Sequence, residues 1–397
     1  MTASQGRIEH EVLLLCARSE LAPEQIDRLR VLVESNLDWD YFYQLARRHS
    51  LVALVAFQLE RSVKESVPPE VRQSFRKDYQ ENAARNLVLA DELISLVKAC
   101  TGVGVEVVIF KGPSLAVSAY GDLALRRFID LDLIVRRADV GRAVEVLTAQ
   151  GYKPSRPLNA EQQALLVRTQ HNLQFTRGRL IVELHWQVSS ELFAASVTAE
   201  ELWQDLETIR INQADMKTLA TENLLFSLCV HGSRHLWQRL AWICDLDRII
   251  ATRKSIDWSR LMTRAKQTSM QRMFLLGPAL AAKILATRLP DSIRDAIGRD
   301  RRIDFLAGRI QERLFDGPEQ LPASLGAILR YNLLIRKDWR SRLRYCRFLF
   351  APTDSDLGAL RLSPSFHFVY YLLRPFRLLH SARARASESP NVGGTRN

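Results

Sequence analysis

The chain has 397 residues, 47% of them apolar and 25% charged, a composition typical of a globular protein with two or three domains. Lys and Arg total 56 against 44 Asp and Glu, and the net charge of +12 favours anionic partners such as nucleotides, RNA or acidic polymers. The five scattered cysteines, which form no C-x-x-C pair, argue against a disulfide framework and a zinc cluster. With no signal-peptide pattern and no apolar stretch long enough for a transmembrane segment, we expect a cytoplasmic protein with reduced thiols.

Residues 1–101 are predicted to form an N-terminal helical region. Three stretches, 22–36, 39–62 and 68–100, carry apolar residues at helical spacing. Pro23 lies near the start of the first stretch, and a proline pair opens the third, as is typical of helix N-termini. This region contains no strand signal.

The pattern changes at residues 102–190, where strands and helices are predicted to alternate. The stretches 105–112 and 130–135 are rich in branched apolar residues and predict buried strands. Residues 139–154 predict a helix that ends at Gly151, and residues 171–188 predict two strands around a turn at 177–178. The fold class is therefore predicted to be α+β, with a small mixed-sheet core flanked by N-terminal helices and a C-terminal helical bundle.

The remainder of the chain is predicted to be helical from residue 191 to residue 380. The stretches 221–237, 238–253, 256–267 and 270–285 fit a helical bundle, and residues 363–380 are expected to form the final ordered element. The small, polar and basic residues 381–397 predict a disordered tail.

Acidic residues occur on two of the predicted strands. Because side chains alternate along a strand, Asp130 and Asp132 share one face, while the apolar residues between and beside them occupy the other. Glu183 has the same relation to its neighbours on a later strand and shares its face with His185. The alternative is an ordinary solvated face of an antiparallel sheet. Three carboxylates on neighbouring strands instead predict a site for divalent cations that serves phosphoryl or nucleotidyl transfer.

A strand-to-helix turn precedes the aspartates. Lys111 and Gly112 end the strand, and Pro113 and Ser114 begin the helix. A helix N-terminus presents free N–H groups to phosphate, and glycine lets a ligand approach the backbone. Taken alone, this turn is better interpreted as an ordinary strand-to-helix connection with a solvent-facing lysine.

Together these residues resemble the nucleotidyltransferase superfamily of the DNA polymerase β type, and in particular its bacterial branch named simply nucleotidyltransferase family proteins. The resemblance covers most of the chain. It rests on an ordered set of residues: Lys111-Gly112, Tyr120, Arg126, Asp130, Asp132 and Glu183-Leu184-His185-Trp186. Two features depart from the wider superfamily, namely Pro113 at the usual phosphate turn and a long interval between Gly112 and Asp130.

The resemblance implies a Mg²⁺-dependent enzyme that moves a nucleoside monophosphate from a nucleoside triphosphate (NTP), such as ATP, to an unidentified small molecule, peptide or protein. Asp130, Asp132 and Glu183 would be the catalytic residues and the ligands of two Mg²⁺ ions. Four residues would bind the nucleotide: Lys111, Gly112, Ser114 and Arg126. Two alternatives stay open: a toxin-like transferase that modifies tRNA, and a non-catalytic nucleotide-binding module.

Further polar residues are candidates for the substrate cleft. His185 is expected on the acidic face, and His231 and His235 share one face of a predicted helix without a third metal ligand. Arg239 is a further cleft candidate, with a possible partner in Asp245, which we interpret as structural. The basic and aromatic residues 336–350 favour either a solvated helical face or contact with RNA or a membrane surface, and nucleic acid is not the favoured partner.

Overall fold

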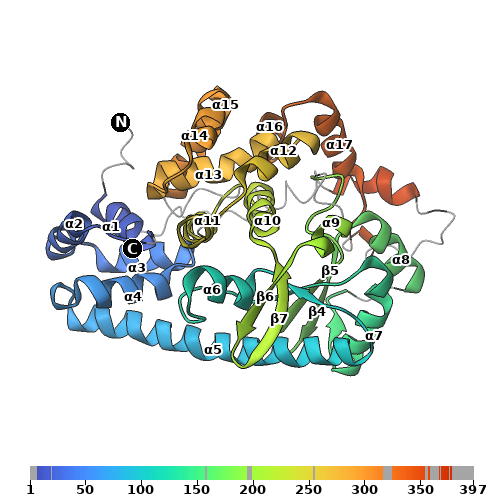
Figure 1. Cartoon of the computed structure of the whole chain (residues 1–397), viewed down its shortest axis with the longest axis horizontal. Coiled ribbons are helices and arrows are strands. Elements are labelled where there is room, and N and C mark those ends of the chain that lie inside the picture. Colours follow the sequence, from blue (N-terminus) through green and yellow to red (C-terminus); the bar gives the residue numbers. More distant parts are fainter. Residues whose placement is uncertain are drawn as a thin grey trace, which may run out of the picture.

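The computed structural model of the protein describes residues 7–18, 20–156, 159–194, 199–253, 255–315, 324–353, 356–357, 366, 368–374 and 376–377. The predicted tail at 381–397, and part of the predicted final element at 363–380, lie outside these residues. Within the described part, every helix is too short or too polar to cross a bilayer. The observed α+β architecture confirms the predicted fold class (Figure 1).

The N-terminal region is helical, as predicted. Its elements are α1 (Ile8–Ala17), α2 (Pro23–Glu34), α3 (Trp39–Arg48), α4 (Val52–Ser62), the 3-10 turn η1 (Lys64–Ser66) and α5 (Pro69–Gly102). The stretch predicted as one helix over 39–62 is divided into α3 and α4, because Ser50 adopts a left-handed backbone with φ of 60°. Helix α1 lies within the predicted helical region, although no separate stretch was delimited for it, and its Val12, Leu13 and Cys16 are fully buried.

Helix α5 joins the two hydrophobic cores of the molecule. It has 34 residues and is therefore about 51 Å long. Phe75 near its start packs in the core of the helical regions, whereas Leu89, Leu93 and Leu96 pack against the sheet. In Figure 1 the helix runs beneath both the N-terminal helices and the strands.

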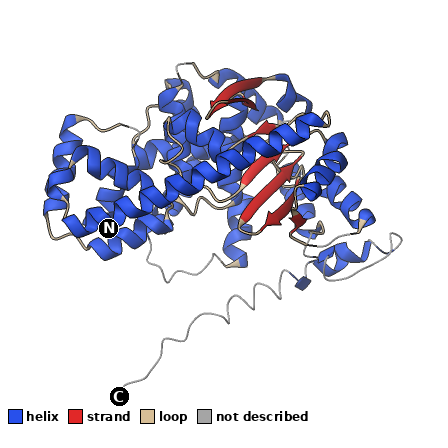
Figure 2. Cartoon of the chain, turned by 90° about the horizontal axis from the view of Figure 1, so that it is seen from below, coloured by secondary structure: helices blue, strands red, loops and turns tan. Residues whose placement is uncertain are grey.

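The sheet is mixed and its strand order is β3-β4-β5-β2-β1-β7-β6. The strands are β1 (Val108–Ile109), β2 (Leu131–Ile134), β3 (Lys153–Pro154), β4 (Asn172–Arg177), β5 (Leu180–His185), β6 (Leu206–Ile211) and β7 (Ala214–Leu219). Strand β2 is parallel to β5, and β1 is antiparallel to β2 and parallel to β7. The helical elements among the strands are α6 (Gly112–Tyr120), η2 (Arg137–Asp139), α7 (Val140–Ala149), α8 (Ala160–Thr169) and α9 (Ala199–Gln204). Figure 2 shows the strands lying among helices.

The β6–β7 hairpin corrects the continuous helical region predicted after residue 190. Its turn uses Asn212 with φ of 52°, and β7 pairs with β1 in the centre of the sheet. Both strands alternate charged with apolar residues, a pattern that marks a strand with one exposed face. The sheet thus continues to residue 219, past the predicted boundary.

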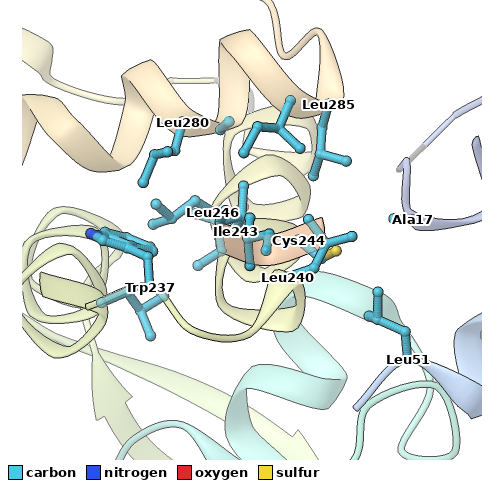
Figure 3. Close-up of a cluster of buried hydrophobic side chains, with 14 of the residues drawn as sticks. Ala17, Leu51, Trp237, Leu240, Ile243, Cys244, Leu246, Leu280 and Leu285 are labelled. Atoms are coloured by element: carbon cyan, nitrogen blue, oxygen red, sulfur yellow. The ribbon is translucent and has the colours of Figure 1, made fainter. Parts of the chain in front are cut away.

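The C-terminal helices pack together above the sheet in Figure 1. They are α10 (Thr221–Arg234), α11 (Leu240–Thr252), α12 (Trp258–Gln267), α13 (Gln271–Leu285), α14 (Asp291–Gly298), α15 (Arg301–Phe315), α16 (Leu325–Leu334) and α17 (Trp339–Phe350). Helix α11 is central: its Ile243 and Leu246 lie near Leu280 of α13, and its Cys244 lies on the side towards Leu51 (Figure 3). Burial of these side chains holds the N-terminal and C-terminal helices in one core.

Candidate active site

The two acidic strands lie side by side in the sheet. Asp132 of β2 is directly opposite Glu183 of β5 in the parallel register, so both side chains project from the same face. On β2, Leu131 and Leu133 belong to the core beneath the other face. Asp130 comes just before the strand and is partly exposed, whereas Asp132 is buried. The sheet therefore places the three predicted acids around one spot.

His185 lies between the two facing carboxylates. Its Nε2 is 3.0 Å from Oδ1 of Asp132 and 3.2 Å from Oε2 of Glu183. The ring is buried and packs edge-on against Phe110 at 5.1 Å. Burial lowers the pKa of His185, but the hydrogen bonds to the two carboxylates outweigh it, so that the net pKa is raised.

Lys111 reaches the same carboxylates from the turn after β1. Its Nζ is 3.4 Å from Oδ1 of Asp132 and 4.5 Å from the centre of the Phe110 ring. The backbone of Lys111 has φ of 57° and ψ of −149°, a conformation that is strained for any residue other than glycine. Gly112 follows with φ of 41° and starts α6. This strained turn places the lysine and the N-terminus of α6 beside the acids.

The acids influence one another electrostatically. Burial and the negative charges of Asp132 and Glu183 raise the pKa of Asp130 to about 6. Burial also raises the pKa of Asp132, but Lys111 and His185 more than compensate and hold it below its ordinary value. The pKa of Glu183 behaves in the same way, with His185 outweighing burial. The site therefore contains two ionised carboxylates and a third that loses its proton less readily.

The donor set suits a divalent cation. Ligand atoms of Asp132, Glu183 and His185 all lie within 4.8 Å of one another, close enough for a single ion to contact each of them. Carboxylate oxygens are the usual ligands of Mg²⁺, and an added imidazole nitrogen also suits Mn²⁺ and other transition metals. In the metal-free protein Lys111 and His185 balance these two carboxylates, and a bound cation would take over that role.

Comparison with known protein families agrees with this geometry. Residues 35–286, more than half of the chain, match a family model described as uncharacterised nucleotidyltransferase. The chain belongs to this nucleotidyltransferase family. No protein with a curated description matches the sequence. The matched span contains every residue predicted for the site and runs from the N-terminal helices through the sheet to α13.

In this nucleotidyltransferase, Arg126 forms an ion pair with an acid that is distant in sequence. Its guanidinium donates two hydrogen bonds, of 2.9 and 3.0 Å, to the carboxylate of Asp245 on α11. Tyr120 donates a third to the same carboxylate at 2.8 Å. Asp245 is buried, so the predicted structural role of this residue agrees with its contacts, although its partner is Arg126 and not Arg239. The pair fixes the segment that leads into Asp130.

The hydroxyl of Ser114 also forms a structural hydrogen bond. Its hydroxyl lies 2.7 Å from Oγ1 of Thr218 on β7, and the side chain is buried. This contact joins α6 to the sheet. The predicted nucleotide contact through the Ser114 hydroxyl would require that bond to be shared or broken.

The two predicted cleft histidines lie together at the end of α10. The rings of His231 and His235 are 4.6 Å apart, and each is 5.4 Å from Trp242. Burial and then the charge of Arg234 lower the pKa of His235 to about 4, so the ring is neutral at pH 7. Arg239 lies over Trp242 at 5.8 Å and lines a small cavity of about 40 Å³ with Arg126.

Sequence reasoning missed the polar residues beyond Glu183. On β4, Asn172 and Gln174 pair with His185 and Glu183, so they lie on the face of the site, and Asn172 donates to Oε2 of Glu183 at 3.0 Å. A cavity of about 230 Å³ adjoins this strand and is lined by Glu183 and by Arg234 of α10. The alternation of polar and apolar residues in 172–175 was the available signal.

Proposed function

We propose that this nucleotidyltransferase moves a nucleoside monophosphate from a Mg²⁺-bound NTP to the hydroxyl group of an acceptor. The observation that carries the proposal is the register of β2 and β5, which sets Asp132 and Glu183 opposite each other with Asp130 alongside. Membership of the nucleotidyltransferase family supports the same reaction.

The nucleotide phosphates would lie on the Lys111 side of the carboxylates. Lys111 supplies a positive charge, and the first N–H groups of α6 have no partners within the helix. Arg126, held by Asp245, would act by fixing the segment before Asp130. Ser114 would act by holding α6 on the sheet.

Asp130, Asp132 and Glu183 would hold the divalent cations, two ions in the proposed arrangement. A bound divalent cation would neutralise the phosphate charge and make the α-phosphorus more open to attack. Glu183 would also accept the proton of the acceptor hydroxyl, because it is partly exposed and its lowered pKa keeps it ionised. Asn172 fixes one Glu183 oxygen through its hydrogen bond and so orients the carboxylate.

The direct test follows which NTP is consumed. The full-length protein is incubated with each of the four α-labelled NTPs and Mg²⁺, with separate pools of small molecules, peptides and total tRNA. We expect label to enter one acceptor class with release of pyrophosphate, and chelation of the metal to stop it. Label in tRNA would favour the tRNA-modifying alternative. Mg²⁺-dependent binding of an NTP without any transfer would favour the non-catalytic module and contradict the proposal.

A further inference from the structure

The cavity beside Glu183 contains a cation that lacks an acidic partner. Arg234 lies at the end of α10 and lines the cavity of about 230 Å³. Its guanidinium forms no ion pair within 4 Å with the described residues, although the negative charge of Glu183 acts on it, and it donates a hydrogen bond to Nε2 of His171. Surrounding protein lowers the pKa of Arg234, yet the side chain keeps an exposed surface. An exposed guanidinium without an ion pair is available to form charge-assisted hydrogen bonds with an anionic ligand in the cavity.

His171 holds the guanidinium of Arg234 in place. Because arginine can only donate, the Nε2 atom of His171 must accept from Arg234, which leaves the ring proton on Nδ1. The ring lines the same cavity and is only 3% exposed, and its Nδ1 has no hydrogen-bond partner among the described residues. The cavity thus offers the guanidinium to a ligand, and His171, whose Nδ1 is buried, holds that guanidinium through Nε2.

The strand order separates this cavity from the phosphate side of the site. Gln174 on β4 pairs with Glu183 on β5, which in turn pairs with Asp132 on β2. Strand β1, which leads to Lys111, lies on the far side of β2. Across the sheet, the order in space is therefore the cavity, Glu183, Asp132 and then Lys111. The carboxylates thus lie between the cavity and the proposed position of the nucleotide phosphates.

From these contacts we infer that the cavity binds the acceptor, and that the acceptor is a small hydroxylated molecule that carries a carboxylate or phosphate group. Arg234, held in place by His171, binds the anionic group, and the hydroxyl is directed to Glu183. The volume is below the range usual for drug-sized ligands, which favours a small metabolite over a nucleic-acid stem. This inference rests on the proposed function for the identity of the reaction.

The chemical step then balances without a further reactant. The acceptor oxygen forms a bond to the α-phosphorus, and the bond from that phosphorus to the bridging oxygen of the β-phosphate breaks. Pyrophosphate leaves with the electron pair. The hydroxyl proton passes to Glu183 and then to water.

Binding is tested first, without turnover. Inorganic phosphate, glycerate and its neutral counterpart glycerol are titrated into the full-length protein by calorimetry and ligand-observed NMR. We expect saturable binding of phosphate and glycerate but not of glycerol, and a loss of affinity of about tenfold or more in Arg234→Gln. Arg210→Gln is the matched control, because it removes an arginine that is 69% exposed on β6 and has only a 3.7 Å ion pair with Asp215.

Several results would overturn the inference. They are unchanged binding in Arg234→Gln, equal binding of glycerol, or no saturable binding of either anion to the wild type. Loss of anion binding in Lys111→Gln but not in Arg234→Gln would place the anion on the nucleotide side and would also overturn it.

The product gives the second test. Label that enters an acidic small molecule supports the inference, and Arg234→Gln should then raise KM for that acceptor more than it lowers kcat. Label that enters tRNA or a neutral acceptor overturns the inference while the proposed function stands. If the wild type fails to bind any Mg²⁺·NTP, the proposed function fails, and the anion titrations still decide whether the cavity binds an acid.

Discussion

Arg126 and Asp245 form a two-hydrogen-bond ion pair across 119 residues of sequence. The pair joins the segment before β2, the strand of the proposed catalytic acids, to α11 at the centre of the helical core. Both side chains are largely buried, with 12% and 1% exposure. The position of Asp130 therefore depends on the packing of the C-terminal helices, even though none of the proposed catalytic acids lies in them.

Asp245→Asn is expected to destabilise the protein, because it leaves a buried guanidinium without a countercharge. Breaking such a pair by removing one partner costs about 3–5 kcal/mol. Urea unfolding at neutral pH measures the change. The matched control is Asp215→Asn, which breaks an exposed pair with Arg210 and should change stability by no more than about 0.5 kcal/mol. Equal effects of the two variants would contradict a structural role for the Arg126–Asp245 pair.

Asp132→Asn is expected to abolish nucleotidyl transfer and leave the fold intact. The amide keeps the size of the side chain and removes the charge that faces Glu183, Lys111 and His185. We expect a loss of at least about 10³-fold in kcat/KM, or about 4 kcal/mol of transition-state stabilisation. Circular dichroism and the unfolding midpoint check the fold. Full activity in this variant would rule out the proposed metal site.

Much of the site could be predicted from local sequence because alternation along a strand is a local property. The orientation of Glu183 and His185 on one face followed from their spacing, whereas Asp130 lies just before β2, so its predicted place on the face of Asp132 stays a prediction. The hairpin around residues 177–178 and the helix ending near Gly151 are also present as predicted. Each of these features depends on residues that are close in the chain.

The contacts that were not predicted are those made between distant segments. Arg234 meets His171 across 63 residues, and Arg126 meets Asp245 across 119. Nothing in the local pattern around Arg126 indicates that its guanidinium forms an ion pair with an acid on α11. The β6–β7 hairpin was missed for a related reason: its charged, alternating strands were read as part of the helical region that surrounds them.

The backbone at Lys111 can be tested separately from its charge. Lys111→Ala and Lys111→Gly both remove the ion pair with Asp132, but only glycine accepts φ of 57° with ψ of −149° without strain. We therefore expect Lys111→Gly to be more stable than Lys111→Ala by about 1 kcal/mol or more. Calorimetric titration should show the same loss of NTP affinity in both variants. A more stable alanine variant would show that the turn relaxes and that the conformation is not required by the fold.

Asp130→Asn is expected to stabilise the metal-free protein at neutral pH, while abolishing transfer. The folded pKa of Asp130 is about 6, against an ordinary value of 3.8, because burial and two neighbouring carboxylates disfavour its charge. The folded state then binds the proton more tightly than the unfolded state, so stability falls as pH rises from about 4 to 6 and stays lower above that. Removing the carboxyl group should recover about 1–3 kcal/mol at about pH 7.5 in the presence of a chelator. The difference in stability between Asp130→Asn and the wild type should shrink as the pH is lowered through that window. It should also shrink when Mg²⁺ is added to the wild type, because the cation takes over the neutralising role of the proton. A variant that is no more stable than the wild type at neutral pH, in matched urea titrations without metal, would contradict this account of the acidic cluster.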